Sequence, residues 1–292
     1  MSLPELTTPI RIYWDITPAP DCSADIEKIA SDIIDLKILT VDISATGSTV
    51  PSACFTILSR FTANRIGVTL TISPAALSAT FFGVLAQAPP KELLVEISGI
   101  DELRTLAPFP PAVAGVSFPL DNCNWQQIPE VIIFSSQNGL QRLVFPMQRL
   151  YHGENPFHLP KRRRDETAAA ISSSQLDPAL RITVHDPFIW RAIFPHSPFP
   201  EGRCQAANTM LSIDSNGIVY PCPVMPLPLG DLKITSLKEI AKGATKRVLR
   251  AKLLRLPQDC ADCAEAAACK GGCRGRGERA FGNWEGIDPG CK

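Results

Sequence analysis

Seven of the ten cysteines in this 292-residue chain are concentrated in its last third, between Cys204 and Cys291. Only two of them, Cys260 and Cys263, form a C-x2-C pair. One such pair is a weak indicator of a metal, but seven thiols in so short a stretch indicate a tail built around metal ligands. The full set is Cys204, Cys222, Cys260, Cys263, Cys269, Cys273 and Cys291.

The residues among these thiols favour iron–sulfur chemistry. Iron–sulfur clusters are held by Cys thiolates, four for a cubane, and one run of cysteines can serve two clusters. Gly271 and Gly272 allow backbone N–H groups to approach the sulfurs, since no Cβ is in the way. Arg274 and Arg276 add positive charge next to the same thiols. We therefore predict that the tail binds iron–sulfur clusters.

Disulfides and structural zinc are the alternative uses of these cysteines. Disulfides need an oxidising compartment, and no secretory signal is recognised in the sequence, so we expect a cytoplasmic protein with reduced thiols. Structural zinc sites usually group four ligands in two tight pairs, whereas this tail has one C-x2-C pair. Iron–sulfur clusters therefore explain these cysteines better than disulfides or structural zinc do.

The spacing resembles the seven-cysteine pattern of the SPASM domain, the auxiliary-cluster domain of radical S-adenosylmethionine (radical SAM) peptide-modifying enzymes. The intervening segments 217–222 (GIVYPC), 236–240 (SLKEI) and 269–273 (CKGGC) are also similar to that domain. The resemblance covers about a third of the chain. It implies two clusters, both expected to be 4Fe–4S.

The resemblance also implies how the thiols are divided. The first cluster takes three ligands, which are Cys204, Cys222 and Cys273. The second cluster takes four ligands, which are Cys260, Cys263, Cys269 and Cys291.

The first set lacks a fourth cysteine. Some SPASM domains supply it six residues before the equivalent of Cys204, where this chain has Pro198. Cys22 and Cys123, in expected strand-to-helix loops, and His196, shortly before Cys204, are the candidates for a fourth ligand.

The first half of the chain alternates strands with helices. Strand patterns occur at 10–15, 39–43, 67–72, 93–97, 112–118 and 143–146, and most are followed by a helical pattern. Six such units imply a parallel sheet with right-handed crossovers. They are too few for an eight-stranded barrel of roughly 250 residues. A partial barrel and an open sheet both fit, and the resemblance implies the partial barrel.

We therefore expect an α/β fold: a partial (β/α)6 TIM-like barrel followed by a small Cys-rich SPASM iron–sulfur domain. The degenerate radical SAM-like barrel is placed in residues 1–187 and the SPASM domain in residues 188–292. Residues 151–180, with the basic run KRRR, break the pattern and are expected to be an exposed loop or linker. Ser236 and Glu239 predict a capping box for one helix that ends at Pro257. Val248 is expected on its buried face, and Lys246 and Arg250 on its basic, solvated face.

Two features of radical SAM enzymes are absent. Their first strand is followed by a C-x3-C-x2-C loop and their second strand by a Gly-Gly-Glu-Pro-like turn. In this chain the corresponding segments are 17–23 (TPAPDCS), with Cys22 alone, and 42–48 (DISATGS). We therefore expect a chain that is not catalytic alone and does not bind S-adenosylmethionine (AdoMet).

The resemblance implies an accessory role in a peptide-modification or maturation system, most similar to the SPASM-domain component of the GeoRSP system. The implied partners are an active radical SAM enzyme, a modified peptide and a small peptide chaperone. The clusters would act in electron relay, peptide binding or complex assembly.

Other functions are a stand-alone iron–sulfur electron carrier, a zinc module that uses a basic helix on RNA, or a barrel enzyme of unknown chemistry. Polar residues that an enzyme would use lie at the expected barrel mouth, namely Asp15, Asp42, Ser44, Glu96 and Asp186. The net charge of +0 argues for neither a nucleic-acid nor a membrane partner, and we expect neither. No apolar run reaches the length of a membrane span.

Overall fold

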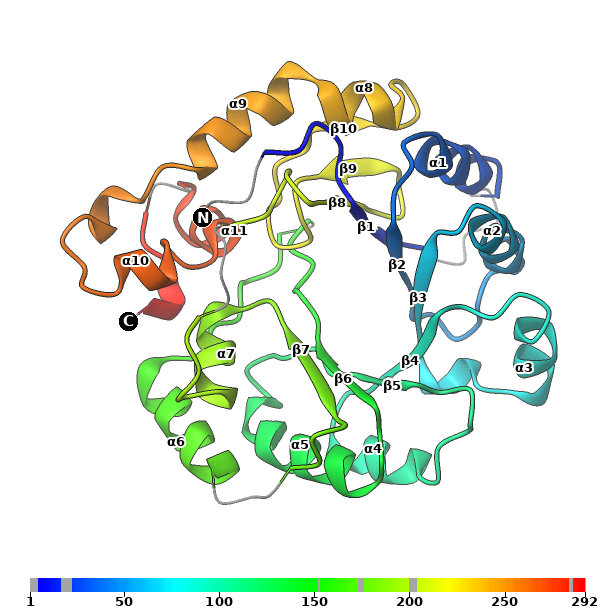
Figure 1. The fold of residues 1–292 in the computed structure, drawn as a ribbon, viewed down its shortest axis with the longest axis horizontal. Helices are drawn as coiled ribbons and strands as arrows, with labels where there is room; N and C mark the ends of the chain where they lie inside the picture. The colour runs from blue at the N-terminus through cyan, green and yellow to red at the C-terminus, as the bar shows by residue number, and fades with distance from the viewer. Residues whose placement is uncertain are drawn as a thin grey trace.

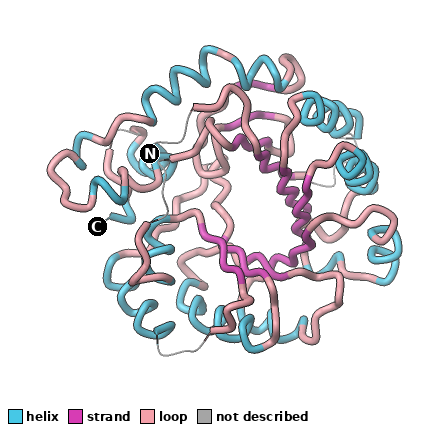
Figure 2. The backbone as a smooth tube through the Cα atoms, in the orientation of Figure 1, coloured by secondary structure: helices cyan, strands magenta, loops and turns pink. Residues whose placement is uncertain are grey.

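The structure is a computed structural model that describes residues 5–16, 23–151, 153–172, 176–199, 204–283 and 286–291. Within these residues, a curved sheet surrounds the centre of the molecule and helices cover its outer side (Figures 1 and 2). The cysteine-rich tail lies against one side of this barrel (Figure 1).

The barrel is built from alternating strands and helices. In chain order they are β1 (Arg11–Asp15), α1 (Ser23–Asp35), β2 (Thr40–Ala45), α2 (Ser52–Ala63), β3 (Gly67–Ile72), α3 (Ala79–Leu85), β4 (Glu92–Glu96), α4 (Ile100–Leu106), β5 (Gly115–Ser117), α5 (Ile128–Gln137), β6 (Arg142–Phe145), α6 (Lys161–Ser172), β7 (Arg181–Val184) and α7 (Pro187–Ile193). Each strand from β1 to β6 pairs in parallel with the next.

Strands β2 and β3 show how the sequence pattern forms the barrel wall. Both alternate buried residues with partly exposed ones, because successive side chains point to opposite faces of a strand. The buried set, including Val41 and Ile43, belongs to the same core cluster as Phe61 of α2. The other set, including Asp42 and Thr69, lines the lumen of the barrel.

The predicted α/β partial barrel is therefore confirmed, and a seventh parallel strand, β7, follows the first six. Among the described helices, none combines the length and hydrophobicity that crossing a bilayer requires.

The prediction of an exposed loop or linker at 151–180 is wrong, because α6 occupies much of this interval. Arg164, Thr167 and Ile171 are buried on one side of α6, at the spacing of a helix face. The buried Arg164 side chain has a hydrogen-bond partner, because its Nη1 donates to the carbonyl of Gly290, at 2.8 Å. The basic run concealed this buried face in the sequence.

The tail continues the barrel sheet instead of forming a separate one. Strand β8 (Met210–Ile213) pairs in parallel with β1, and β9 (Ile218–Tyr220) and β10 (Gly230–Asp231) follow in antiparallel pairs. The strand order is β10-β9-β8-β1-β2-β3-β4-β5-β6-β7. Because the sheet is continuous from barrel to tail, it does not mark where one domain ends and the next begins. The domain boundary at residue 187 stays a prediction.

The tail helices are α8 (Leu237–Lys242), α9 (Ala244–Leu253), α10 (Ala266–Cys269) and α11 (Arg274–Phe281). The predicted capping box of Ser236 and Glu239 is present at α8. The expected single helix is divided at Gly243, whose backbone is extended. Val248, expected on the buried face, is therefore 58% exposed.

Two basic residues expected on the solvated face of that helix are buried. Lys246 donates from Nζ to the carbonyls of Leu6 (3.0 Å) and Thr7 (3.1 Å). Arg250 forms two hydrogen bonds to the Glu5 carboxylate, at 2.7 and 2.8 Å. Residues 5–7, which precede β1, are thus held along α9.

The pairing of β8 with β1 predicts that barrel and tail unfold together. Ile213, opposite Trp14 in this pair, is fully buried. Ile213→Ala should lower the free energy of unfolding by about 2–5 kcal/mol in a single transition, measured by denaturant titration. Ile234→Ala, at an 83% exposed position, should change it by less than about 0.5 kcal/mol. Separate transitions for barrel and tail would contradict the prediction.

Candidate metal centre

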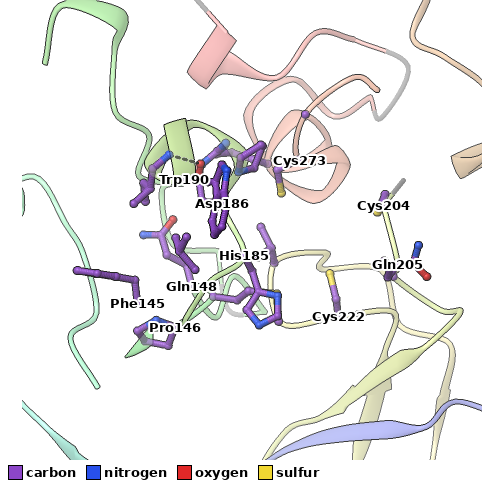
Figure 3. Close-up of a pocket in the computed structure, with 18 of the residues that line it drawn as sticks. Phe145, Pro146, Gln148, His185, Asp186, Trp190, Cys204, Gln205, Cys222 and Cys273 are labelled. Carbon is purple, nitrogen blue, oxygen red and sulfur yellow. Dashed lines mark hydrogen bonds and ion pairs between the residues drawn. The ribbon is translucent and has the colours of Figure 1, made fainter. Parts of the chain in front are cut away.

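A cavity of about 260 Å³ lies between the carboxyl ends of β6 and β7 and the tail. Residues that follow these two strands, including Gln148 and His185, form its barrel side (Figure 3). Four cysteines of the tail also line it, namely Cys204, Cys222, Cys269 and Cys273, and Figure 3 labels three of them. The cavity thus brings together the thiols expected to hold the first cluster.

The three thiols lie in an environment that disfavours free thiolates. Burial raises the pKa of Cys222 well above its usual value, and the charges of Cys204 and Cys273 raise it further. Burial likewise raises the pKa of Cys273 to about 12. Because metal ligands must be deprotonated, loading this site would release protons.

Backbone and side-chain donors around the first cavity counter this effect. The N–H groups of Val224 and Met225 point to Cys222 and lower its thiol pKa. Arg250 donates from Nη1 to the carbonyl of Cys204, at 2.7 Å. Its charge and that of Arg274 lower the pKa of Cys204, against the larger effect of burial.

A second cavity, of about 520 Å³, lies on the outer side of the tail. All four cysteines expected at the second cluster line it, namely Cys260, Cys263, Cys269 and Cys291. Cys269 also lines the first cavity, so the two cavities share a wall.

The glycines beside Cys269 act as the sequence predicts. Burial raises the pKa of the Cys269 thiol, and hydrogen bonds from the N–H groups of Gly271 and Gly272 lower it. Gly271 has φ +92, and a Cβ there would lie 2.6 Å from Cδ of Pro257. Another residue would therefore disturb the turn that directs these N–H groups to the sulfur.

The cavities fit a multi-iron group better than a single zinc ion. Zinc holds its ligands at roughly 2.0–2.3 Å, which brings them close together. Within the described part of the chain, no three His, Cys, Asp or Glu side chains are grouped closely enough for one ion. The thiols instead surround cavities, and a cluster places its thiolates on different irons.

None of the expected fourth ligands is seen at the first cavity. Cys22 lies outside the described residues. Cys123 is exposed, and neither it nor His196 lines the cavity. The polar residue that sequence reasoning missed is His185, which lines both this cavity and the barrel lumen. Its position directly after a parallel strand was the available signal.

His185 has a lowered pKa, although its side chain is exposed where it borders the two cavities. Desolvation by the surrounding protein, together with the charges of Arg11 and Arg142, lowers this pKa. Its Nε2 lies 3.3 Å from the Tyr13 hydroxyl, and the two rings pack edge to face. His185 therefore presents an uncharged ring between the lumen and the first cavity.

The acidic residues at the barrel mouth are mostly paired. Asp15 forms an ion pair with Arg149 at 2.9 Å, and Asp42 lies 3.4 Å from Arg11. Burial raises the pKa of Glu96, which lines the lumen.

Ser44 and Asp186 complete the candidate enzyme set. Ser44 lines the lumen. Asp186 caps α7, accepting from the N–H groups of Phe188 (2.7 Å) and Ile189 (3.0 Å). None of the five residues forms a nucleophile–base pair in the contacts described.

Among the described residues, the lumen cavity has a volume of about 60 Å³. Residues 17–22, which follow β1, lie outside the described residues.

Comparison with known proteins identifies the tail. Residues 204–264 match the family model of SPASM, an iron-sulfur cluster-binding domain. The tail contains a SPASM domain. No curated protein sequence matches the chain.

Solved structures share the fold over nearly the whole chain. SuiB from Streptococcus suis bound to S-adenosylmethionine matches with a TM-score of 0.69 and 16% identity, over 99% of this chain and 78% of that one. SuiB bound to its precursor peptide SuiA has a TM-score of 0.67 and 15% identity, over 97% and 76%. Native anSMEcpe with bound AdoMet and Cp18Cys peptide has a TM-score of 0.62 and 13% identity, over 96% and 94%. At these identities the likeness shows a common fold, the radical SAM-type partial barrel with a SPASM domain.

These matches correct the expectation that the chain is not an enzyme. The structures that it resembles are of enzymes of the radical SAM fold, and they hold AdoMet. The absence of the C-x3-C-x2-C motif therefore does not show that the chain lacks enzymatic activity. The accompanying expectation that AdoMet is not bound receives no support from these relatives.

The burial of the thiols predicts an order of alkylation in the metal-free protein. Cys123 and Cys263 are exposed and should react first with iodoacetamide at pH 8. Burial raises the pKa of Cys54 to about 12 and that of Cys222 well above normal, so both should react last because little thiolate is present. Mass spectrometry of peptides measures the order. Equal labelling of Cys222 and Cys263 would contradict it.

Proposed function

We propose that this chain is an iron–sulfur protein of a radical SAM-type peptide-modification system, with two 4Fe–4S clusters beside a peptide-binding cleft. The observation that carries the proposal is the division of seven tail cysteines between two adjoining cavities. Apart from Cys269, which lines both cavities, the division corresponds to the two ligand sets that the SPASM resemblance implies.

The first cluster would take Cys204, Cys222 and Cys273. This set provides three thiolates, so a fourth ligand must come from elsewhere. Apolar and aromatic residues line the same cavity, including Phe145 and Trp190, which is typical of sites that bury a ligand. We therefore place the bound segment of a peptide in this cavity, next to the first cluster.

The second cluster would take Cys260, Cys263, Cys269 and Cys291, a complete set for a cubane. Because Cys269 also borders the first cavity, the two clusters would lie close enough to exchange electrons. Iron–sulfur clusters supply one-electron chemistry when bound. The chain's own residues hold and shield them, and the second set has no free position for a ligand.

The peptide assignment draws on the relatives. SuiB is seen with the precursor peptide SuiA, and anSMEcpe with the Cp18Cys peptide. In this chain the first cavity offers a comparable place between barrel and tail. We propose a cytoplasmic system similar to GeoRSP, in which a radical SAM enzyme and a small peptide chaperone are further partners.

The cluster content tests the proposal. Anaerobically reconstituted protein should contain about eight iron and about eight sulfide per chain, for two cubanes. Cys204→Ala should change only one paramagnetic resonance signal, and Cys263→Ala only the other, because the residues belong to different cavities. Cys123→Ala, at an exposed cysteine outside both sets, is the matched control. Stoichiometric zinc without sulfide, or loss of both signals in Cys204→Ala, would refute the proposal.

The incomplete first set predicts a response to peptide thiols. A synthetic peptide that contains one Cys should shift the resonance signal that Cys204→Ala alters, because its thiolate can occupy the remaining iron. The same peptide with Ser in place of Cys is the control and should leave the signal unchanged. Cys263→Ala should keep the response. A response that persists in Cys204→Ala would contradict binding at the first cluster.

A further inference from the structure

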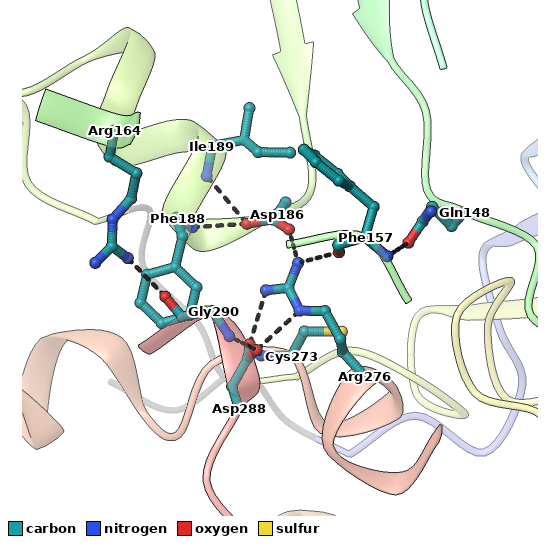
Figure 4. Close-up of polar contacts among 10 residues, drawn as sticks. All are labelled: Gln148, Phe157, Arg164, Asp186, Phe188, Ile189, Cys273, Arg276, Asp288 and Gly290. Carbon is teal, nitrogen blue, oxygen red and sulfur yellow. Dashed lines mark hydrogen bonds and ion pairs between the residues drawn. The ribbon is translucent and has the colours of Figure 1, made fainter. Parts of the chain in front are cut away.

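Asp288 contacts the backbone of one ligand from each cysteine set. Its carboxylate oxygen Oδ2 accepts a hydrogen bond from the N–H of Cys273, at 2.5 Å (Figure 4). Its backbone carbonyl accepts from the N–H of Cys291, at 2.9 Å. Asp288 is 1% exposed. A single buried residue therefore fixes the turns that carry Cys273 of the first set and Cys291 of the second.

Arg276 neutralises this buried carboxylate. Its Nε lies 2.8 Å from Oδ1 of Asp288 and its Nη2 lies 2.8 Å from Oδ2 (Figure 4). Its Nη1 forms an ion pair with Asp186, the residue that caps α7. Arg276 thereby connects the ligand turns to the end of β7, and it is 4% exposed.

The backbone is shaped to allow this contact. Gly272 has φ +66, and a Cβ there would lie 2.6 Å from Oδ2 of Asp288. At Gly290 a Cβ would lie 2.7 Å from the Phe188 ring and 3.3 Å from Oδ1 of Asp288. Glycine at both positions lets the two turns close on the carboxylate.

Charges buried this deeply act strongly on nearby groups, because solvent screens them little. The Asp288 carboxylate, in contact with the backbone of Cys273, opposes the addition of an electron to a neighbouring cluster. The Arg276 guanidinium favours it. Reduction potentials of clusters depend on such local charge and on hydrogen bonds.

We propose that Asp288 and Arg276 form a positioning and charge-setting pair shared by the two cluster sites. Asp288 holds one ligand turn of each site, and the opposite charges of the pair set both reduction potentials. This inference rests on the proposed binding of two clusters.

The test is a redox titration of the full chain with reconstituted clusters, followed by paramagnetic resonance. Asp288→Asn removes a negative charge with little change of shape, so both potentials should become more positive. Arg276→Gln removes a positive charge, so both should become more negative. Opposite shifts distinguish a charge effect from a general loosening of the site, which would not change sign with the charge removed.

Asp259→Asn is the matched control. Asp259 is also next to a ligand, Cys260, but it is exposed to solvent. Its substitution should shift only the second potential, and by less than Asp288→Asn does, because water screens the charge. A shift as large as that of Asp288→Asn would overturn the special role of the buried pair.

The double variant Asp288→Asn/Arg276→Gln keeps the test decisive if either single variant fails to fold, since it leaves neither half of the Asp288–Arg276 pair charged. Its potentials should return toward those of the wild type. Wild-type protein without clusters would refute the proposed function itself. Wild-type protein with two clusters, but with unaltered potentials or shifts of the same sign in the variants, would overturn only the inference.

Discussion

The parallel pairing of β8 with β1 is the interaction on which the rest of the arrangement depends. A partial barrel leaves the edge of β1 open, and exposed strand edges tend to pair with other chains. Here the tail covers that edge, with Trp14 opposite Ile213. The same pairing places the cysteines of the tail beside the carboxyl ends of β6 and β7, so the first cavity exists because the sheet continues across barrel and tail.

Much of this arrangement was predictable, because its signals are local. Alternating apolar residues predicted the strands of the barrel, and Ser236 with Glu239 predicted the start of α8. The cysteine spacing predicted a tail of metal ligands before any contact was known. In the structure, the thiols lie around two cavities in the expected sets, with Cys269 lining both, while their assignment as ligands stays a prediction.

The errors arose where charged residues are buried through distant contacts. The basic run of α6 indicated a loop, but Arg164 reaches the carbonyl of Gly290. Lys246 and Arg250 looked like parts of a solvated face, but they hold residues 5–7. A prediction from hydrophobic patterns places every charged residue at the surface, because the pattern carries no information on contacts with residues distant in the sequence. His185 was missed for a related reason, because only the fold brings it beside the tail thiols.

The contacts of residues 5–7 with α9 have a consequence for folding order. Glu5 precedes the whole barrel in the sequence, whereas Arg250, its partner, follows 245 positions later. Contacts between residues so far apart in sequence carry a large loop-closure cost and slow folding. The edge of β1 stays uncovered on the ribosome until the tail emerges. The unfinished barrel therefore has an open strand edge during synthesis, and the thiols can gather around their cavities only after the tail has been made.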